Sequence, residues 1–136
     1  QTLAAQVPFC SLPVWSLIDA RKNEVYAASF NCQTGKPEPV TAEAVIAPQR
    51  LLSTISGNAV FIGSGAVAHQ TLINDSMGPR ALFPPPSLHA PRATAAALLA
   101  WEKHLAGQSI PGHRLCPTYI RPSEAELAWK SKNAAG

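Results

Sequence analysis

Residues 16–30, SLIDARKNEVYAASF, decide the fold, because they read as two strands joined by a charged turn. Apolar and polar residues alternate on both sides of the charges, with the period of two that is typical of a half-buried strand. We therefore predict a strand over residues 14–20 and an antiparallel partner over residues 25–32. A polar turn around Asn23 joins them into a hairpin.

The segments after the hairpin predict helices that alternate with strands. The run AVFIGSGA is nearly all apolar and indicates a strand buried on both faces. An alanine-rich segment from Pro91 to Gly107 predicts a long helix with an apolar stripe. The elements expected are a strand over residues 40–47, a helix over 48–56, the buried strand from 59, a helix over 66–75, a brief strand over 81–86, the long helix over 91–107, an extended segment over 116–120, and a last helix over 122–132 with a capping box from Ser123 to Glu126.

This order of elements predicts an α/β domain. Its mixed sheet opens with an antiparallel hairpin or meander, and helices pack against the sheet. We expect the core to lie on the sheet and under the long helix. The side chains expected to be buried are Val14, Leu17 or Trp15, Ile18, Val25, Val60, Ile62, Leu98 and Leu99.

The composition indicates one globular domain. The chain has 136 residues, 46% hydrophobic and 14% charged, which excludes the disordered class. Its net charge of +3 comes from scattered cations, without the run that would track a phosphate backbone. No apolar segment reaches the ~18 residues that a membrane span needs, and no signal peptide opens the sequence. A cytoplasmic location is expected.

Neither the cysteines nor the histidines suggest a metal site. The three cysteines are widely spaced and form no C-x-x-C pair, which suits a reducing compartment better than a disulfide framework. The four histidines lack ligand spacing among themselves or with the cysteines. We expect surface or hydrogen-bonded histidines and no bound metal.

Two places in the sequence could carry chemistry. Asp19 ends the first strand, where a carboxylate could hold a hydrated magnesium ion, although Glu24 across the turn is expected to pair with Arg21. The glycine loop, Gly63–Gly65, joins the buried strand to a helix, where the backbone could approach a phosphate. It lacks the third glycine of a dinucleotide fingerprint and the lysine of a P-loop, so a tight turn is the favoured explanation of its glycines. No nucleophile elbow occurs, so no catalytic triad is predicted.

Four stretches carry a resemblance when they are taken together. They are TLAAQ at residues 2–6, IDARKNEVYAASF at 18–30, VFIGSGA at 60–66 and PTYIRPSEAEL at 117–127. In this order they resemble the C-terminal half of proteins of the glycoprotease-like (Gcp-like) family, within the actin/Hsp70-type ATPase superfamily. The resemblance extends over nearly the whole chain.

The resemblance implies an RNase H-like lobe of a two-lobe, actin-like protein. Residues 1–136 would form this single C-terminal lobe. Residues 1–7 would be the end of a helix from the preceding lobe, and residues 117–136 an extended tail with a short helix.

The resemblance also implies a function in transfer RNA modification. The chain would be part of a non-catalytic scaffold subunit, a pseudo-enzyme, of the bacterial machinery that makes threonylcarbamoyladenosine at position 37. Its implied partners are the catalytic relative TsaD and the ATPase TsaE, contacted mainly through the N-terminal lobe. Transfer RNA would be contacted indirectly, and the fragment could self-associate. The chain itself would require no cofactor, and ATP with magnesium would act only in the full complex.

The hairpin departs from the pattern of active members of the superfamily. In those proteins, glycines follow the aspartate and wrap phosphates, whereas here the residues 20–23, Ala-Arg-Lys-Asn, carry side chains. The hairpin is therefore interpreted as scaffold, with no catalytic residue. Positions implied for a weak or vestigial nucleotide site are Asp19, Gly63, Ser64 and Gly65, and those implied for a partner or transfer RNA are Arg21, Lys22, Tyr119 and Arg121.

Two other functions remain open on the sequence. One is a small hydrolase dependent on magnesium and ATP, which would use Asp19 and the glycine loop. In that case an Asp19→Ala change should abolish magnesium-dependent nucleotide binding. The other is an RNA-binding module, whose affinity for transfer RNA would fall steeply with salt.

Overall fold

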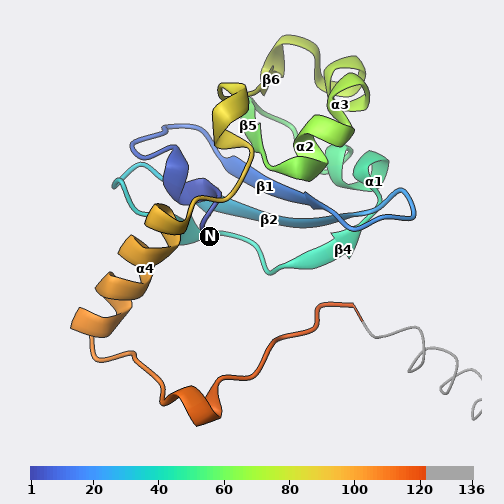
Figure 1. Cartoon of the computed structure of the whole chain (residues 1–136). Helices are drawn as coiled ribbons and strands as arrows, with labels where there is room; N and C mark the ends of the chain where they lie inside the picture. Colours follow the sequence, from blue (N-terminus) through green and yellow to red (C-terminus); the bar gives the residue numbers. More distant parts are fainter. Residues whose placement is uncertain (122–136) are drawn as a thin grey trace, which may run out of the picture.

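The computed structural model describes residues 1–121, so the helix expected over residues 122–132 lies outside the described residues. At its centre is a six-stranded sheet in the order β3-β2-β1-β5-β6, with β4 paired to β2 (Figure 1). β2 is antiparallel to β1, β3 and β4, whereas β5 is parallel to β1 and β6. The mixed sheet and the α/β class are confirmed. The strands are β1 Val14–Asp19, β2 Val25–Asn31, β3 Glu38–Pro39, β4 Ala44–Ile46, β5 Ala59–Ile62 and β6 Ala81–Leu82.

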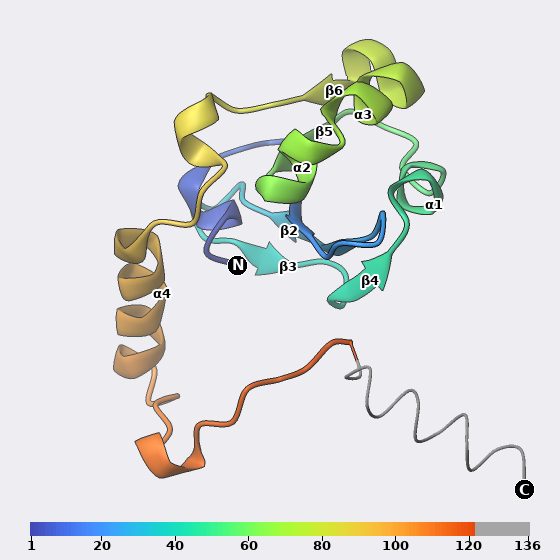
Figure 2. The ribbon, with the colours of Figure 1, turned by 45° about the vertical axis from the view of Figure 1, so that its right-hand side comes forward.

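Two layers of side chains cover the two faces of the sheet. On one face, Leu17, Val25 and Phe61 pack in a single cluster with side chains of α1, α2 and α3. Figure 2 shows these three helices on one side of the sheet. On the other face, Leu3 and Ala4 at the start of η1 cover a smaller cluster of strand residues. The helices are α1 Pro48–Leu52, α2 Ser64–Ala68, α3 Gln70–Met77 and α4 Ala93–Leu105, and the 3-10 turns are η1 Ala4–Gln6, η2 Gly78–Arg80, η3 Pro86–Leu88 and η4 Gly112–Arg114.

The hairpin forms as predicted, with Asp19 opposite Val25 at its closed end. The Ala20 amide donates to the Glu24 carbonyl at 2.9 Å, and the Glu24 amide donates to the Arg21 carbonyl at 3.0 Å. Between them, three consecutive residues that are not glycine have positive φ. The φ values are 61° for Arg21, 52° for Lys22 and 59° for Asn23. Three consecutive positive φ values strain the backbone of residues that have a Cβ, so contacts around the turn must hold the tip in this conformation.

The core prediction is confirmed for most strand positions. Val14, Leu17, Val25, Val60 and Ile62 are all buried. All four residues of β5 are buried, as its near-continuous apolar sequence indicated.

The prediction for Ile18 is wrong, because this side chain is 49% exposed. In β1 it follows Val14 and Ser16 on the same face of the sheet. Near the closed end of the hairpin, Ile18 lines open hollows beside Leu3. The strand pattern identified the face correctly, but this part of the face is uncovered.

The prediction that α4 covers the core is also wrong. Leu98 is 67% exposed, and Trp101 and Leu105 are exposed with it, while Leu99 is only half-buried. In Figures 1 and 2 the helix extends away from the sheet. The proline-rich segment 84–91 after β6 leads the chain to the edge of the domain, and α4 begins there. The apolar stripe exists, but it does not face the sheet.

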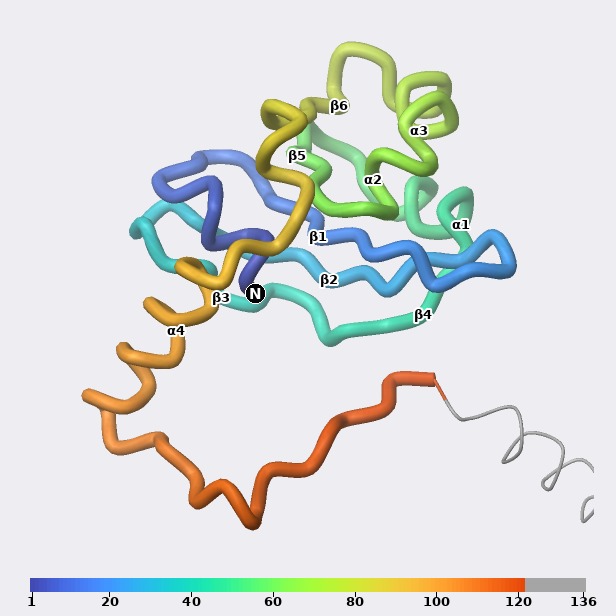
Figure 3. Tube along the Cα trace, in the orientation of Figure 1, coloured from blue at the N-terminus to red at the C-terminus, as the bar shows by residue number. Residues whose placement is uncertain are grey.

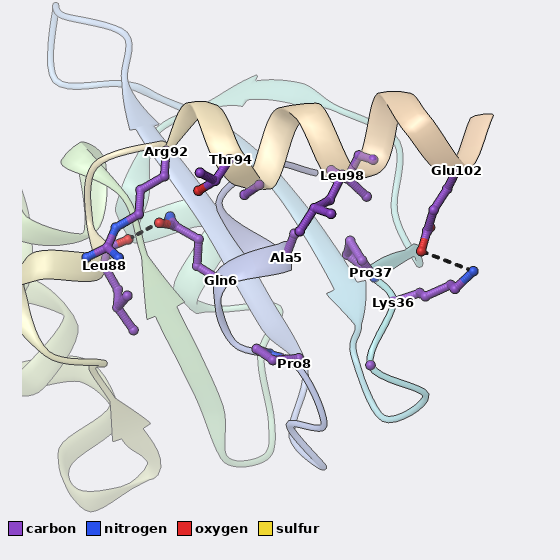
Figure 4. Close-up of a pocket in the computed structure, with 13 residues that line it drawn as sticks. Ala5, Gln6, Pro8, Lys36, Pro37, Leu88, Arg92, Thr94, Leu98 and Glu102 are labelled. Atoms are coloured by element: carbon purple, nitrogen blue, oxygen red, sulfur yellow. Dashed lines mark hydrogen bonds and ion pairs between the residues drawn. The ribbon is translucent and has the colours of Figure 1, made fainter. Parts of the chain in front are cut away.

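Two contacts tie α4 and the following chain to the rest of the domain. A hollow of about 380 Å³ separates α4 from η1, and the Glu102 carboxylate reaches the Lys36 ammonium group at 3.2 Å across its rim (Figure 4). After Gly107, which ends the helix with φ 70° as predicted, the chain is extended and exposed. It runs back toward the hairpin (Figure 3), where Arg121 contacts the carbonyl of Ala20.

Three further elements differ from the prediction. The helix expected over residues 66–75 is two helices that meet at His69. The strand expected over residues 40–47 is reduced to β4, and α1 ends at Leu52, well before Gly57. Within residues 1–121, no helix is long and apolar enough to cross a membrane.

Candidate functional site

The candidate site lies where β1 and β5 end. Because these two strands are parallel, Asp19 at the end of β1 and the glycine loop after β5 reach the same edge of the sheet. In open α/β sheets this edge is where ligands usually bind. The Asp19 amide donates a hydrogen bond to the Ser64 hydroxyl at 3.2 Å. The fold thus brings together the residues that the sequence suggested for a nucleotide site.

The carboxylate of Asp19 is already engaged within its own turn. Its Oδ1 accepts the Arg21 amide at 2.9 Å, and its Oδ2 lies 3.7 Å from the Arg21 guanidinium. The Asp19 side chain is 31% exposed, whereas that of Arg21 is 89% exposed. The expected pairing of Glu24 with Arg21 is therefore wrong. Asp19 caps the turn, and this contact helps to hold the left-handed tip.

The glycines of the loop are required by packing against β1. Gly63 has φ 110°, and a Cβ added there would lie 2.2 Å from the Leu17 carbonyl oxygen. A Cβ on Gly65 would lie 3.0 Å from Val25 Cγ1 and 3.1 Å from the Ile18 carbonyl carbon. The close packing of the loop on the strands is enough to explain both glycines, with or without a ligand.

His89 holds the glycine loop from the other side, a contact that sequence reasoning missed. The Gly63 amide donates to Nδ1 of the ring at 3.1 Å, and Nε2 lies 3.2 Å from the Pro84 carbonyl oxygen. Since Nδ1 accepts, the ring proton sits on Nε2 and is donated to Pro84. His89 was expected only to be a surface or hydrogen-bonded residue. Its 26-residue separation from Gly63 leaves no local sequence signal for the contact.

The four positions suggested for partner or transfer RNA contacts are not gathered into one patch. Arg21 and Lys22 are exposed at the hairpin tip, and Tyr119 is 81% exposed on the extended chain. Arg121 instead contacts the base of the hairpin, where Nη1 donates to the Ala20 carbonyl at 3.1 Å. Its Nη2 forms an ion pair with the Glu24 carboxylate.

Two hollows flank the site. One, of about 530 Å³, lies between the glycine loop, Ile18 and the segment that carries His89. The other, of about 370 Å³, lies over the uncovered face of β1 and β2. Its floor contains Ser16, whose hydroxyl is buried without a hydrogen-bond partner among residues 1–121. In the same described part of the chain, no group of three or more His, Cys, Asp or Glu residues is arranged to hold a metal ion.

Comparison with known proteins gives sequence and structural relatives. No family model matches the chain. It is 27% identical over 132 residues to the tRNA threonylcarbamoyladenosine biosynthesis protein TsaB of Bacillus subtilis (strain 168), a match that covers 95% of this chain and 56% of that protein. The chain therefore spans little more than half the length of this curated relative.

Solved structures agree with this similarity at the level of the fold. YeaZ from Pseudomonas aeruginosa matches with a TM-score of 0.65 and 21% identity, over 87% of this chain and 55% of that one. An uncharacterized protein with similarity to peptidase YEAZ from Pseudomonas aeruginosa matches with a TM-score of 0.62 and 24% identity, over 82% of this chain and 50% of that one. Together the comparisons confirm a resemblance to TsaB and YeaZ over part of the length of those proteins.

Proposed function

Because the chain is similar to TsaB and has the fold of YeaZ, we propose that it acts in the biosynthesis of threonylcarbamoyladenosine on transfer RNA. It would do so as the C-terminal lobe of a TsaB-like scaffold subunit. The observation that carries this proposal is the similarity to TsaB over 95% of the chain. The order of the hairpin, glycine loop and terminal motifs along the sequence supports it.

The geometry of the hairpin supports a non-catalytic role. A phosphate-binding hairpin needs bare backbone amides, and here the tip carries the side chains of Arg21, Lys22 and Asn23. The Asp19 carboxylate, the natural group for a magnesium ion, is engaged by the Arg21 amide and guanidinium. A magnesium ion at Asp19 would have to displace these contacts. We therefore infer that this edge of the sheet is structural, with at most weak nucleotide binding at Asp19, Ser64 and the two loop glycines.

The proposed partners are TsaD and TsaE, contacted mainly through a lobe that lies outside this chain. On this lobe, the exposed positions proposed for a secondary contact are Arg21 and Lys22 at the hairpin tip and Tyr119 on the extended chain. Arg121 is less suited, because its guanidinium already contacts Glu24 and Ala20. A partner that used Arg121 would first have to break this ion pair.

A chimera tests the proposal directly. The part of Bacillus subtilis TsaB that aligns with this chain would be replaced by residues 1–136, and threonylcarbamoyladenosine would be measured on transfer RNA in the reconstituted system. We expect the chimera to support the modification, while the remaining part of TsaB alone does not. A chimera that folds and binds TsaD, yet supports no modification, would contradict the proposal.

Calorimetry provides a second test, which asks whether the contact with TsaD lies on this lobe or on the other one. We expect the isolated chain to bind TsaD several orders of magnitude more weakly than the chimera does, since a few anchor residues dominate most interfaces. Equal affinities would place the interface on this lobe and refute the assignment of the contact to the other one.

A further inference from the structure

The segment 84–91 makes hydrogen bonds to two distant parts of the sequence, the N-terminal turn and the glycine loop. The Gln6 amide group donates to the carbonyls of Leu88 and Ala90, both at 3.0 Å. From the same segment, the His89 ring accepts the Gly63 amide at 3.1 Å. The segment, the glycine loop and the N-terminal turn are thereby joined into one hydrogen-bonded unit.

This arrangement is compatible with only one protonation state of His89. Nδ1 must present a lone pair to the Gly63 amide, while Nε2 must carry the hydrogen that reaches the Pro84 carbonyl. Adding a second proton would turn Nδ1 into a donor and place it against another donor. The hydrogen bond to Gly63 would then be lost, and a half-buried amide would remain without that acceptor.

The residues that line the two hollows beside His89 are mostly apolar. They include Ile18 of β1, Val67 of α2, Phe83, Pro86 and Pro91, with Ser64 of α2 and Gln70 of α3 as neutral polar residues. The charged or titratable groups on or next to the elements that line these hollows include Asp19, His69 and Arg92. Asp19 lies behind Ser64, His69 lies at the junction of α2 and α3, and the Arg92 guanidinium bonds the Ser87 carbonyl at 3.2 Å.

We propose that His89 is a positioning residue for the glycine loop, and that protonation of its ring releases the loop from the segment 84–91. The consequence is local, because Ser64 still accepts the Asp19 amide and Gly65 still packs on β1. Gly63 would lose its hydrogen bond to His89, and the segment 84–91 would be held less firmly at the wall of the adjacent 530 Å³ hollow. The imidazole ring is suited to such a switch because its charge changes near neutral pH.

Nuclear magnetic resonance of the whole chain, labelled with ¹⁵N, tests this inference without any mutation. Long-range ring correlations should show the neutral His89 ring with its hydrogen on Nε2. On acidification, the Gly63 amide resonance should move with the same midpoint as the His89 ring. A neutral ring with its hydrogen on Nδ1, or a Gly63 amide that does not follow the ring, would overturn the proposal.

Two substitutions separate positioning from general stability. His89→Asn keeps an acceptor atom close to the place of Nδ1, so the Gly63 amide should stay bonded and its resonance should no longer move on acidification. His113→Asn, at an exposed histidine in η4, should leave the titration of Gly63 as it is in the parent chain. A Gly63 amide that still titrates in the folded His89→Asn variant would assign the effect to another group and refute the proposal.

Discussion

The guanidinium of Arg121 is ion-paired with the carboxylate of Glu24, although the two residues are 97 positions apart in the sequence. Arg121 belongs to the terminal motif PTYIR and Glu24 to the hairpin motif IDARKNEVY. A second nitrogen of the same guanidinium donates to the Ala20 carbonyl at 3.1 Å. The two most distinctive motifs of the sequence are therefore one structural unit, in which the terminal motif holds the base of the hairpin.

This contact predicts a moderate loss of stability in an Arg121→Ala variant. Both side chains are about one-third exposed, at 29% and 33%, so solvent weakens the pair. We expect the free energy of unfolding to fall by about 1 kcal/mol, measured by urea denaturation. Arg114→Ala, at an exposed position in η4, is the matched control and should change stability by less than about 0.5 kcal/mol. Equal effects of the two variants would show that the ion pair does not stabilise the chain.

A methyl group at Gly63 should be far more damaging. Its Cβ would lie 2.2 Å from a backbone oxygen of β1, and φ 110° is unfavourable for any residue with a Cβ. Gly63→Ala is expected to cost about 3 kcal/mol of unfolding free energy. Gly57→Ala is the control, because nothing lies within 4 Å of its added Cβ. A neutral Gly63→Ala variant would mean that the loop does not pack on β1 in this way.

The exposure of α4 leads to a clear contrast between two leucines. Leu17 is 1% exposed and Leu98 is 67% exposed. Leu17→Ala should cost about 2–5 kcal/mol in urea denaturation, whereas Leu98→Ala should cost less than about 0.5 kcal/mol. If Leu98→Ala proved as costly as Leu17→Ala, the helix would have to be packed against the domain in solution.

The cysteines should differ sharply in reactivity. Burial, with a smaller effect of the nearby Cys10, raises the pKa of Cys32 from 9.0 to about 11. At mildly alkaline pH a thiol reagent should therefore modify Cys116, which is exposed, long before Cys32. Labelling followed by mass spectrometry of the peptides measures both rates. Similar rates would contradict the burial of Cys32.

The same pKa determines how Cys32 affects stability at high pH. Because the folded state holds the thiol proton more tightly than the unfolded state, the contribution of Cys32 is complete below pH 9 and declines as pH rises from 9 toward 11. A Cys32→Ala variant should lack this part of the alkaline decline. The comparison is made by urea denaturation of both proteins across that range, and parallel curves would contradict the shift.

Local patterns predicted the parts of the fold that depend on local chemistry. The alternation around the hairpin predicted β1 and β2, and the apolar run predicted β5, because the periodicity and burial of a strand depend on consecutive residues. The exposure of Ile18 and Leu98 could not be predicted in this way. An apolar stripe shows which side of an element prefers burial, but not whether another element covers it.

The same limit applies to the candidate site. Topology placed Asp19 beside the glycine loop as the sequence suggested, since parallel strands end at one edge. The partners of the charged groups could not be foreseen, because Glu24 bonds Arg121 rather than Arg21, which is much nearer in sequence. The contact of His89 with Gly63 likewise depends on how the segment 84–91 crosses the domain.

The left-handed tip of the hairpin also determines which residues the turn accepts with least strain. Arg21, Lys22 and Asn23 already have the backbone angles that glycine adopts most easily. A glycine-rich tip of the same length could therefore adopt this turn with the strand register unchanged and with less backbone strain than Arg21, Lys22 and Asn23 impose.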